Sequence, residues 1–136
     1  MFHVEHAKRA AHWLQAGAAE LGLPLHDTAV GLFHKYLTEL NKWNEKVNLT
    51  ALRTDEDIVI KHFLDSLVCC KLLQISGQAR LLDVGAGAGF PGLPIKIALR
   101  SITLTLIEPS QKKTAFLRHI VGVLGLEGVT VVPARI

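Results

Sequence analysis

Hydrophobic residues recur at helical spacing through the first part of the chain. This spacing predicts a first helix over residues 4–21, which ends where Gly22 and Pro24 interrupt the pattern. A second helix is expected from Asp27, which we predict to cap it. Apolar residues then repeat every three or four positions along one face: Phe33, Tyr36, Leu37, Leu40 and Trp43. Packing into a core is a sufficient explanation for that face.

A third helix is predicted after an irregular polar segment at residues 44–53. It starts at Thr54, because Thr54 followed by Asp57 resembles a capping box, and it runs to about Leu73. Apolar side chains form its inner side: Phe63, Leu64, Leu67 and Val68. The first part of the chain is therefore expected to be wholly helical.

From residue 80 onward the pattern alternates between strands and helices. Strands are expected at 80–84, 102–107 and 129–132, and helices at 93–99 and 111–124, with Ser110 and Gly125 as the caps of the last helix. Such alternation predicts a parallel sheet with right-handed crossovers. The fold class is therefore α/β, with residues 1–78 as an amino-terminal helical extension and 79–136 as a sheet domain.

The first strand of this sheet is expected to lie at an unpaired edge. A doubly wound sheet grows in both directions from its first strand, and only three strands are present. Because residues 80–84 are typical of a fully buried strand, we expect the chain to hold only the first part of a longer domain.

Composition narrows the functional classes. Of 136 residues, 49% are hydrophobic and 20% charged, which favours a globular protein over a disordered one. No apolar run reaches the roughly 18 residues of a membrane span. Charged residues near the start exclude a secretory signal at that position, so a cytoplasmic protein is expected. The net charge of +3 permits nucleic-acid binding without establishing it.

Two adjacent cysteines, Cys69 and Cys70, lie in the predicted third helix. Neighbours in sequence rarely form a disulfide, and no Cys or His spacing typical of zinc is present. We therefore expect two packed thiols and no metal site.

The segment Asp83-Val84-Gly85-Ala86-Gly87-Ala88-Gly89-Phe90-Pro91-Gly92 is the most informative part of the sequence. It joins the end of the first strand to a helix, where glycines let a ligand lie against the backbone and the N–H groups of the helix start are expected to face that ligand. A dinucleotide fingerprint matches Gly87, Gly89 and Gly92, with Glu108 about 20 residues on.

A second template, acidic-x-G-x-G-x-G, matches Asp83, Gly85, Gly87 and Gly89. It is typical of methyltransferases that use S-adenosylmethionine. We favour it because the ammonium group of that cofactor suits the carboxylate of Asp83, whereas a dinucleotide fingerprint usually has an apolar residue there.

The end of the second strand supplies further candidates for cofactor binding. Glu108 stands where a carboxylate accepts hydrogen bonds from both ribose hydroxyls. Taken alone it would be interpreted as a solvated strand-end acid, but its spacing from the glycine turn favours the ribose. Pro109 and Ser110 would flank the adenosine, and Phe90 would press on the cofactor, although an aromatic residue in a turn is as often part of a core.

Two further motifs, Asn44-Glu45-Lys46-Val47-Asn48-Leu49-Thr50 and His62-Phe63-Leu64-Asp65-Ser66, complete a family resemblance. With the glycine turn, they make the chain resemble the bacterial small-subunit ribosomal RNA guanine-N7 methyltransferases, the glucose-inhibited division protein B family. The resemblance runs from about residue 32 to 136. It implies a Rossmann-like class I methyltransferase fold of which only the first three strands are present.

The resemblance also implies a cofactor, a partner and a reaction. The cofactor is S-adenosylmethionine, held at Gly85, Phe90, the second-strand end and Ile136, and the partner is small-subunit ribosomal RNA or a ribosomal particle. Methyl transfer to guanine N7 needs no general base, because this nitrogen has no proton to lose. His62 and Asp65 are the catalytic candidates, since they would either steady the extension against the cofactor turn or ease the charge on the methylated ring. A local His–Asp hydrogen bond that holds two elements together is an equally open interpretation.

Two alternative functions remain open from the sequence. One is a nicotinamide-dependent oxidoreductase with a Rossmann fold. The other is a non-catalytic fragment, stable only as an oligomer that covers the bare edge of its first strand.

Overall fold

The computed structural model describes residues 2–136, with side chains from residue 8 onward. Its helices are α1 (Phe2–Glu20), α2 (Asp27–Asn44), α3 (Asp55–Ile58), α4 (Asp65–Leu72), α5 (Gly92–Ala98) and α6 (Gln111–Leu124), with a π-helix, η1 (Val59–Leu64), between α3 and α4. The strands are β1 (Arg80–Val84), β2 (Thr103–Ile107) and β3 (Val129–Val132). All three predicted strands and the alternation with helices are therefore confirmed.

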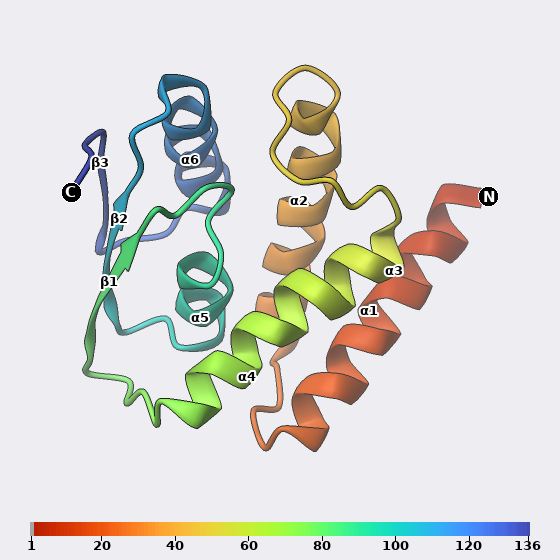
Figure 1. Cartoon of the computed structure of the whole chain (residues 1–136). Coiled ribbons are helices and arrows are strands. Elements are labelled where there is room, and N and C mark those ends of the chain that lie inside the picture. Colours follow the sequence, from red (N-terminus) through yellow and green to blue (C-terminus); the bar gives the residue numbers. More distant parts are fainter. Residues whose placement is uncertain (1) are drawn as a thin grey trace.

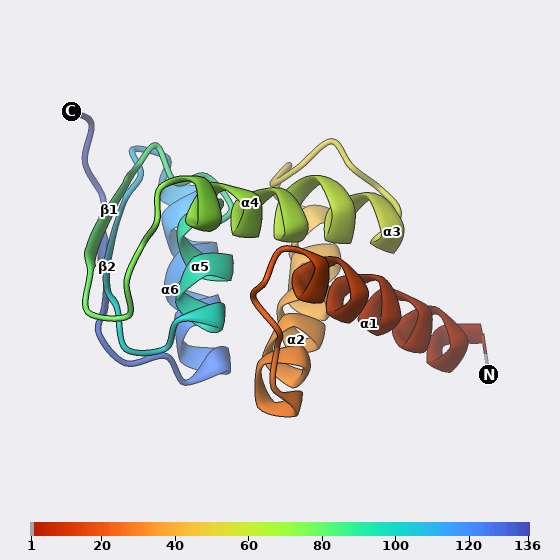
Figure 2. The same ribbon diagram turned by 90° about the horizontal axis from the view of Figure 1, so that it is seen from below.

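The strands form one parallel sheet in the order β1-β2-β3. Helices α5 and α6 lie against one face of this sheet, and the amino-terminal helices form further layers beyond them (Figures 1 and 2). α2 packs against both α5 and α6, and α4 runs from the α1 side of the molecule to α5. The helical extension is thus joined directly to α5, which follows the glycine turn, and to α6.

One hydrophobic core passes through the extension and the sheet layer. Its fully buried members come from both parts of the chain: Leu14, Phe33, Tyr36, Phe63, Leu93, Leu106 and Phe116. Each large apolar side chain removed from water contributes about 1.5–3 kcal/mol. This shared core fixes the position of the extension relative to the site at the strand ends.

The helix boundaries follow their local sequence signals in most cases. Thr54 caps α3 by accepting a hydrogen bond from the Asp57 N–H at 3.1 Å, Ser110 caps α6 through the Lys113 N–H, and Gly125 ends α6 in the left-handed conformation. The prediction that Asp27 caps α2 was wrong. His26 is the residue that precedes the helix, and Asp27 stands inside the first turn, where its charge favours the helix dipole.

The predicted third helix is continuous, but its middle is not α-helical. Residues Val59–Leu64 form a π-helical turn with wider hydrogen-bonded rings. Such turns occur often at functional sites, and this one carries His62. Both cysteines at the end of the segment are free thiols, as expected, with Cys70 buried.

The strand β1 lies at the edge of the sheet, but it is less buried than its sequence predicted. Leu81 and Asp83 point toward the helical layer, whereas Leu82 and Val84 are each 56% exposed on the opposite face. That face carries no helix in residues 2–136, which is why the prediction of a fully buried strand was wrong. Among the helices described, none is long and apolar enough to cross a membrane.

Candidate functional site

The candidate site lies at the carboxyl ends of β1 and β2. The register pairs Val84 with Ile107, so the glycine turn after β1 and Glu108 after β2 meet at the same edge of the sheet. The turn is tied to β2 by its backbone, because the N–H groups of Gly85 and Ala86 both donate to the Ile107 carbonyl. This is the edge where open α/β sheets bind ligands.

The three glycines of the motif have different structural roles. Gly85 and Gly87 have φ angles of +74° and +58°, and a Cβ at either position would meet no atom within 4 Å. They leave bare backbone facing open space, as the sequence predicted. Gly89 has φ +104°, and a Cβ there would lie 2.6 Å from the Tyr36 hydroxyl and 2.5 Å from Leu93 Cδ1. Gly89 is therefore required by internal packing.

Asp83 is turned toward the start of α5. Its Oδ2 accepts a hydrogen bond from the Gly92 N–H at 3.0 Å, and the residue is only 8% exposed. Burial raises the pKa of the Asp83 carboxyl above its usual value, and the bond from Gly92 offsets part of that rise. Asp83 thus caps a helix as well as standing at the strand end.

The expectation that the N–H groups of the α5 start face a ligand was wrong. The Gly92 N–H is bonded to Asp83 and the Leu93 N–H to the Gly89 carbonyl, at 2.7 Å. In the described part of the chain, the turn's unbonded donors are instead the N–H groups of Ala88 and Phe90. The N–H groups at the start of the helix are buried, and a buried backbone donor needs a hydrogen-bond partner within the protein. In this turn they therefore bond to groups of the protein itself.

Glu108 is a buried carboxylate, 6% exposed, that links the two strand ends. Its Oε1 accepts from the Gly87 N–H and its Oε2 from the Ser110 N–H, each at 2.8 Å. The interpretation as a solvated strand-end acid is therefore wrong, because both oxygens hold backbone donors of the turns they join. Each oxygen keeps a second lone pair that accepts no hydrogen bond from the described residues.

The other candidates at the second and third strand ends are less closely held. Pro109 is exposed beside Glu108, and Ser110 is half-buried at the start of α6. Ile136 lies beyond the end of β3 and is 83% exposed. The structure brings Asp83, the glycine turn, Glu108 and Ser110 together by hydrogen bonds, whereas among the described residues no hydrogen bond joins Ile136 to them.

Tyr36 is a part of the site that its sequence pattern did not reveal. The hydroxyl of this fully buried residue donates to the Ala88 carbonyl at 2.6 Å, 52 positions along the chain. Burial, with the charge of Asp83 as a smaller cause, raises the pKa of the Tyr36 hydroxyl well above its usual value, so it stays a donor. The helical pattern of α2 indicated only that Tyr36 belongs to the core. The sequence does not show which acceptor the Tyr36 hydroxyl bonds to.

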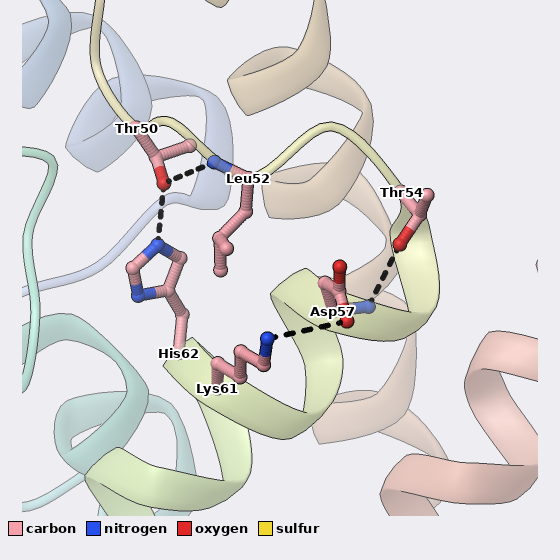
Figure 3. A network of polar contacts seen from close by, with 6 residues as sticks. All are labelled: Thr50, Leu52, Thr54, Asp57, Lys61 and His62. Atoms are coloured by element: carbon pink, nitrogen blue, oxygen red, sulfur yellow. Dashed lines mark hydrogen bonds and ion pairs between the residues drawn. The ribbon is translucent and has the colours of Figure 1, made fainter.

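His62 is the second contact between the extension and the turn. Its ring stacks on Phe90, with centroids 4.2 Å apart and planes at 8°, and its Nε2 lies 2.7 Å from the Thr50 hydroxyl (Figure 3). Burial lowers the pKa of the His62 imidazole, while the charge of Asp65 opposes that change.

The predicted local hydrogen bond between His62 and Asp65 is not among the bonds of the described residues. Asp65 is exposed and begins α4, and the carbonyl of His62 instead accepts from the Ser66 hydroxyl at 2.6 Å. The His62 ring is instead engaged by the Thr50 hydroxyl and by stacking on Phe90, while Asp65 acts on it only through its charge. His62 holds two elements together through Thr50 and Phe90.

The irregular segment before α3 is shaped by Asn44, a buried side chain at the end of α2. Its Oδ1 accepts from the N–H groups of Leu49 and Thr50, and its Nδ2 donates to the Thr50 carbonyl at 3.0 Å. An open polar hollow of about 410 Å³ lies beside this segment. It is lined by Asn41, Asn44, Glu45, Asn48, Leu52 and Arg53.

The fold places the chain in a defined structural class. It is similar to a solved structure described as coclaurine N-methyltransferase bound to N-methylheliamine and SAH, with a TM-score of 0.52, 17% identity, and coverage of 96% of this chain and 38% of that one. The parallel order, the glycine turn after β1 and the acidic residue after β2 are those of a Rossmann-like methyltransferase fold. Residues 30–136 match the family model described as rRNA small subunit methyltransferase G. The chain belongs to this family.

Curated relatives agree with this assignment. Proteins named ribosomal RNA small subunit methyltransferase G are 45% identical over 127 residues in Geobacter sulfurreducens and 49% identical over 118 residues in Roseiflexus castenholzii. They are matched over 93% and 87% of this chain but 58% and 50% of their own lengths. The chain therefore spans about half the length of these relatives. The family assignment decides against the nicotinamide-dependent oxidoreductase, although the glycines also match its fingerprint.

Among the described residues, no group of three or more His, Cys, Asp or Glu side chains is arranged so that it could hold a metal ion. The acidic side chains of the site are used in a different way. Asp83 and Glu108 both accept hydrogen bonds from backbone N–H groups, which leaves the glycine turn rigidly fixed between them.

Proposed function

We propose that this chain forms the cofactor-binding half of an enzyme that transfers a methyl group from S-adenosylmethionine to N7 of a guanine in small-subunit ribosomal RNA. The family assignment is the observation that carries this proposal. The geometry of the turn supports it, because bare backbone at Gly85 and Gly87 faces open space between two buried carboxylates.

The residues of the turn fit the two ends of this cofactor. The N–H groups of Ala88 and Phe90 are available for its carboxylate, and Oδ1 of Asp83 for its ammonium group. Glu108 offers the remaining lone pairs of its two oxygens to the ribose hydroxyls. Gly85, Gly87 and Gly89 allow the close approach, while Phe90, Pro109, Ser110 and Ile136 are the flanking contacts that we propose.

The proposed reaction needs no acid or base from the protein. When bound, S-adenosylmethionine supplies an electrophilic methyl group on a positively charged sulfur. Guanine N7 carries a free lone pair and no proton, so no residue has to act as a base. The work of the protein is to hold the two reactants in line and to exclude water, which accounts for a site built from backbone donors and rigid turns.

The RNA is proposed to lie across the end of the molecule that carries the strand ends. The start of α6 and the polar segment 44–53 lie at that end of the molecule (Figure 1). Their exposed cations are Lys112 on α6 and Lys46 and Arg53 on the segment. Half-buried Lys113 and exposed Arg118 are further cations of α6. These groups suit RNA phosphates, and the hollow beside Arg53 offers amide groups to an unpaired base.

Calorimetric titration of the chain with S-adenosylhomocysteine and with NADH tests cofactor choice. We expect heat of binding for S-adenosylhomocysteine alone. The matched variants are Asp83→Asn, which keeps the hydrogen bond to Gly92 and removes the charge, and Lys71→Glu on the far end of α4 as a control. Asp83→Asn should weaken binding by about tenfold, the size of one charge-assisted hydrogen bond. Binding of NADH instead of S-adenosylhomocysteine would reject the proposal.

Filter binding with a fragment of small-subunit ribosomal RNA tests the partner. Reversal of charge at Lys112 and Lys113 should weaken binding and reduce its dependence on salt, because each lost phosphate contact removes roughly one released counterion. Reversal at Lys71 should change neither. Equal effects at all three lysines would mean that net charge, and no particular face, attracts the RNA.

A second candidate is a non-catalytic fragment that self-associates. The exposed Leu82 and Val84 and the free edge of β1 favour it, since such an edge can pair with another chain. Its signature is a melting temperature that rises with protein concentration together with no heat on titration with S-adenosylhomocysteine. A concentration-independent melting temperature would exclude it.

A further inference from the structure

The Thr50 hydroxyl connects the polar segment to the π-helical turn. It accepts a hydrogen bond from the Leu52 N–H at 3.2 Å and lies 2.7 Å from His62 Nε2 (Figure 3). A hydroxyl that accepts from Leu52 still has its own proton to donate, so the arrangement is complete when it donates to a neutral imidazole at Nε2. Thr50 therefore fixes the rotation of the His62 ring.

The His62 ring in turn fixes Phe90. The two rings are parallel within 8° at 4.2 Å, and Tyr36 stacks near Phe90 at 5.6 Å between ring centroids. Phe90 is one of the two residues of the turn, with Ala88, whose backbone N–H has no partner among the described residues, so contacts that hold its ring also restrain the backbone that carries this donor. Two contacts, Thr50 with His62 and His62 with Phe90, thus lead from the polar segment to the proposed cofactor-binding backbone.

We propose that Thr50 is a positioning residue for cofactor binding, which acts by orienting His62 so that its ring holds Phe90 and the Phe90 N–H toward the ligand. This inference rests on the proposed function. It adds that two residues of the helical extension, Thr50 and His62, position the cofactor-binding turn. The π-helical turn at Val59–Leu64 supports it, because that local geometry carries the His62 ring between Thr50 and Phe90.

The chain offers a matched set of variants for the test. Thr50→Val keeps the shape and removes the hydroxyl, whereas Thr50→Ser keeps the hydroxyl. His62→Phe keeps a ring for stacking and removes Nε2. Thr38→Val is the control, because the Thr38 hydroxyl is exposed on α2 and bonds only to the His34 carbonyl of its own helix.

Two measurements apply to each variant, the amide NMR signal of Phe90 in the free protein and the affinity for S-adenosylhomocysteine by calorimetry. Thr50→Val should shift the Phe90 amide signal and weaken binding by about threefold to tenfold, which corresponds to the loss of one hydrogen bond. Thr50→Ser should restore both readouts. The double variant Thr50→Val/His62→Phe should bind no more weakly than either single variant, because each removes the same hydrogen bond.

The outcomes separate the inference from the proposed function. An unchanged Phe90 signal in Thr50→Val, or additive losses of affinity in the double variant, would overturn the positioning role. A wild-type chain that takes up no S-adenosylhomocysteine would reject the proposed function, and the positioning of a ligand donor with it. A purely structural role for Thr50 would lower the stability toward urea without changing the affinity of the folded protein, and this result also counts against the inference.

Discussion

The substitution Gly89→Ala should be far more damaging than Gly85→Ala, although both glycines belong to one motif. Alanine at position 89 would place its methyl carbon 2.6 Å from the Tyr36 hydroxyl and 2.5 Å from Leu93 Cδ1, whereas the space around Gly85 is open. The φ angle of Gly89, +104°, also lies outside the region that alanine adopts readily.

The magnitude follows from these two effects. Backbone strain at such an angle costs on the order of 1–3 kcal/mol, and forcing an extra methyl group into a packed core costs about 1–3 kcal/mol more. We therefore expect Gly89→Ala to lower the free energy of unfolding by roughly 2–6 kcal/mol, out of a total of about 5–15 kcal/mol for an ordinary domain. Gly85→Ala, with φ +74° and no clash, should cost only about 1–2 kcal/mol.

Equilibrium unfolding in urea, followed by circular dichroism, measures both variants. Tyr36→Phe supplies an internal check, because it removes the hydroxyl that the new methyl group would meet. In the wild type this change leaves the Ala88 carbonyl without its partner and should cost about 1–3 kcal/mol. In the Gly89→Ala background it should cost less than in the wild type, since it also relieves the contact with the hydroxyl, while the contact with Leu93 Cδ1 remains.

Two results would refute this reasoning. If Gly89→Ala is no more destabilising than Gly85→Ala, the packing around position 89 yields easily. If Tyr36→Phe costs the same in both backgrounds, the hydroxyl is not the atom that excludes a side chain from this position.

Three further predictions test the acidic residues. Asp83→Asn should be at least as stable as the wild type at neutral pH, because burial raises the pKa of the Asp83 carboxyl in the folded protein and so disfavours its charged form. The stability of the wild type relative to the variant should therefore fall as the pH rises through that pKa. Urea unfolding from about pH 3 to pH 8 measures this difference. Glu108→Gln should lose about 1–3 kcal/mol in the same assay, since its amide group would face a backbone donor, whereas a change below about 0.5 kcal/mol would mean a solvated side chain. Asp65→Asn should lower the pKa of His62 further in an NMR titration, and an unchanged titration would exclude any electrostatic action of Asp65 on that ring.

The elements of the fold were predictable because each is encoded within a short stretch of sequence. The apolar residues of β2 and β3 are β-branched or leucine, and Ser110 and Gly125 mark the ends of α6 by local hydrogen bonds. The exposure of Leu82 and Val84 was not predictable in this way. It depends on what covers a sheet face, which is a property of the whole domain.

The candidate site was only partly predictable, because its decisive bonds join residues far apart in sequence. Glu108 lies 21 positions from Gly87, and Tyr36 lies 52 from Ala88. Sequence patterns place a carboxylate at a strand end and a tyrosine on a helix face, but they do not show which backbone group each one meets. The π-helical turn was missed for a related reason, since Val59–Leu64 also satisfies the spacing of an ordinary helix.

These long-range bonds change what the motif means. The acidic residue before the glycine turn was predicted to bind a ligand through its charge. In the structure, Asp83 accepts a hydrogen bond from the backbone of Gly92, and Glu108 accepts hydrogen bonds from the backbones of Gly87 and Ser110. A carboxylate held in this way loses little further entropy when a ligand arrives, because its rotamer is already fixed. The same bonds that stabilise the turn therefore preorganise it for a ligand, and replacement of either acid should weaken binding even where the protein still folds.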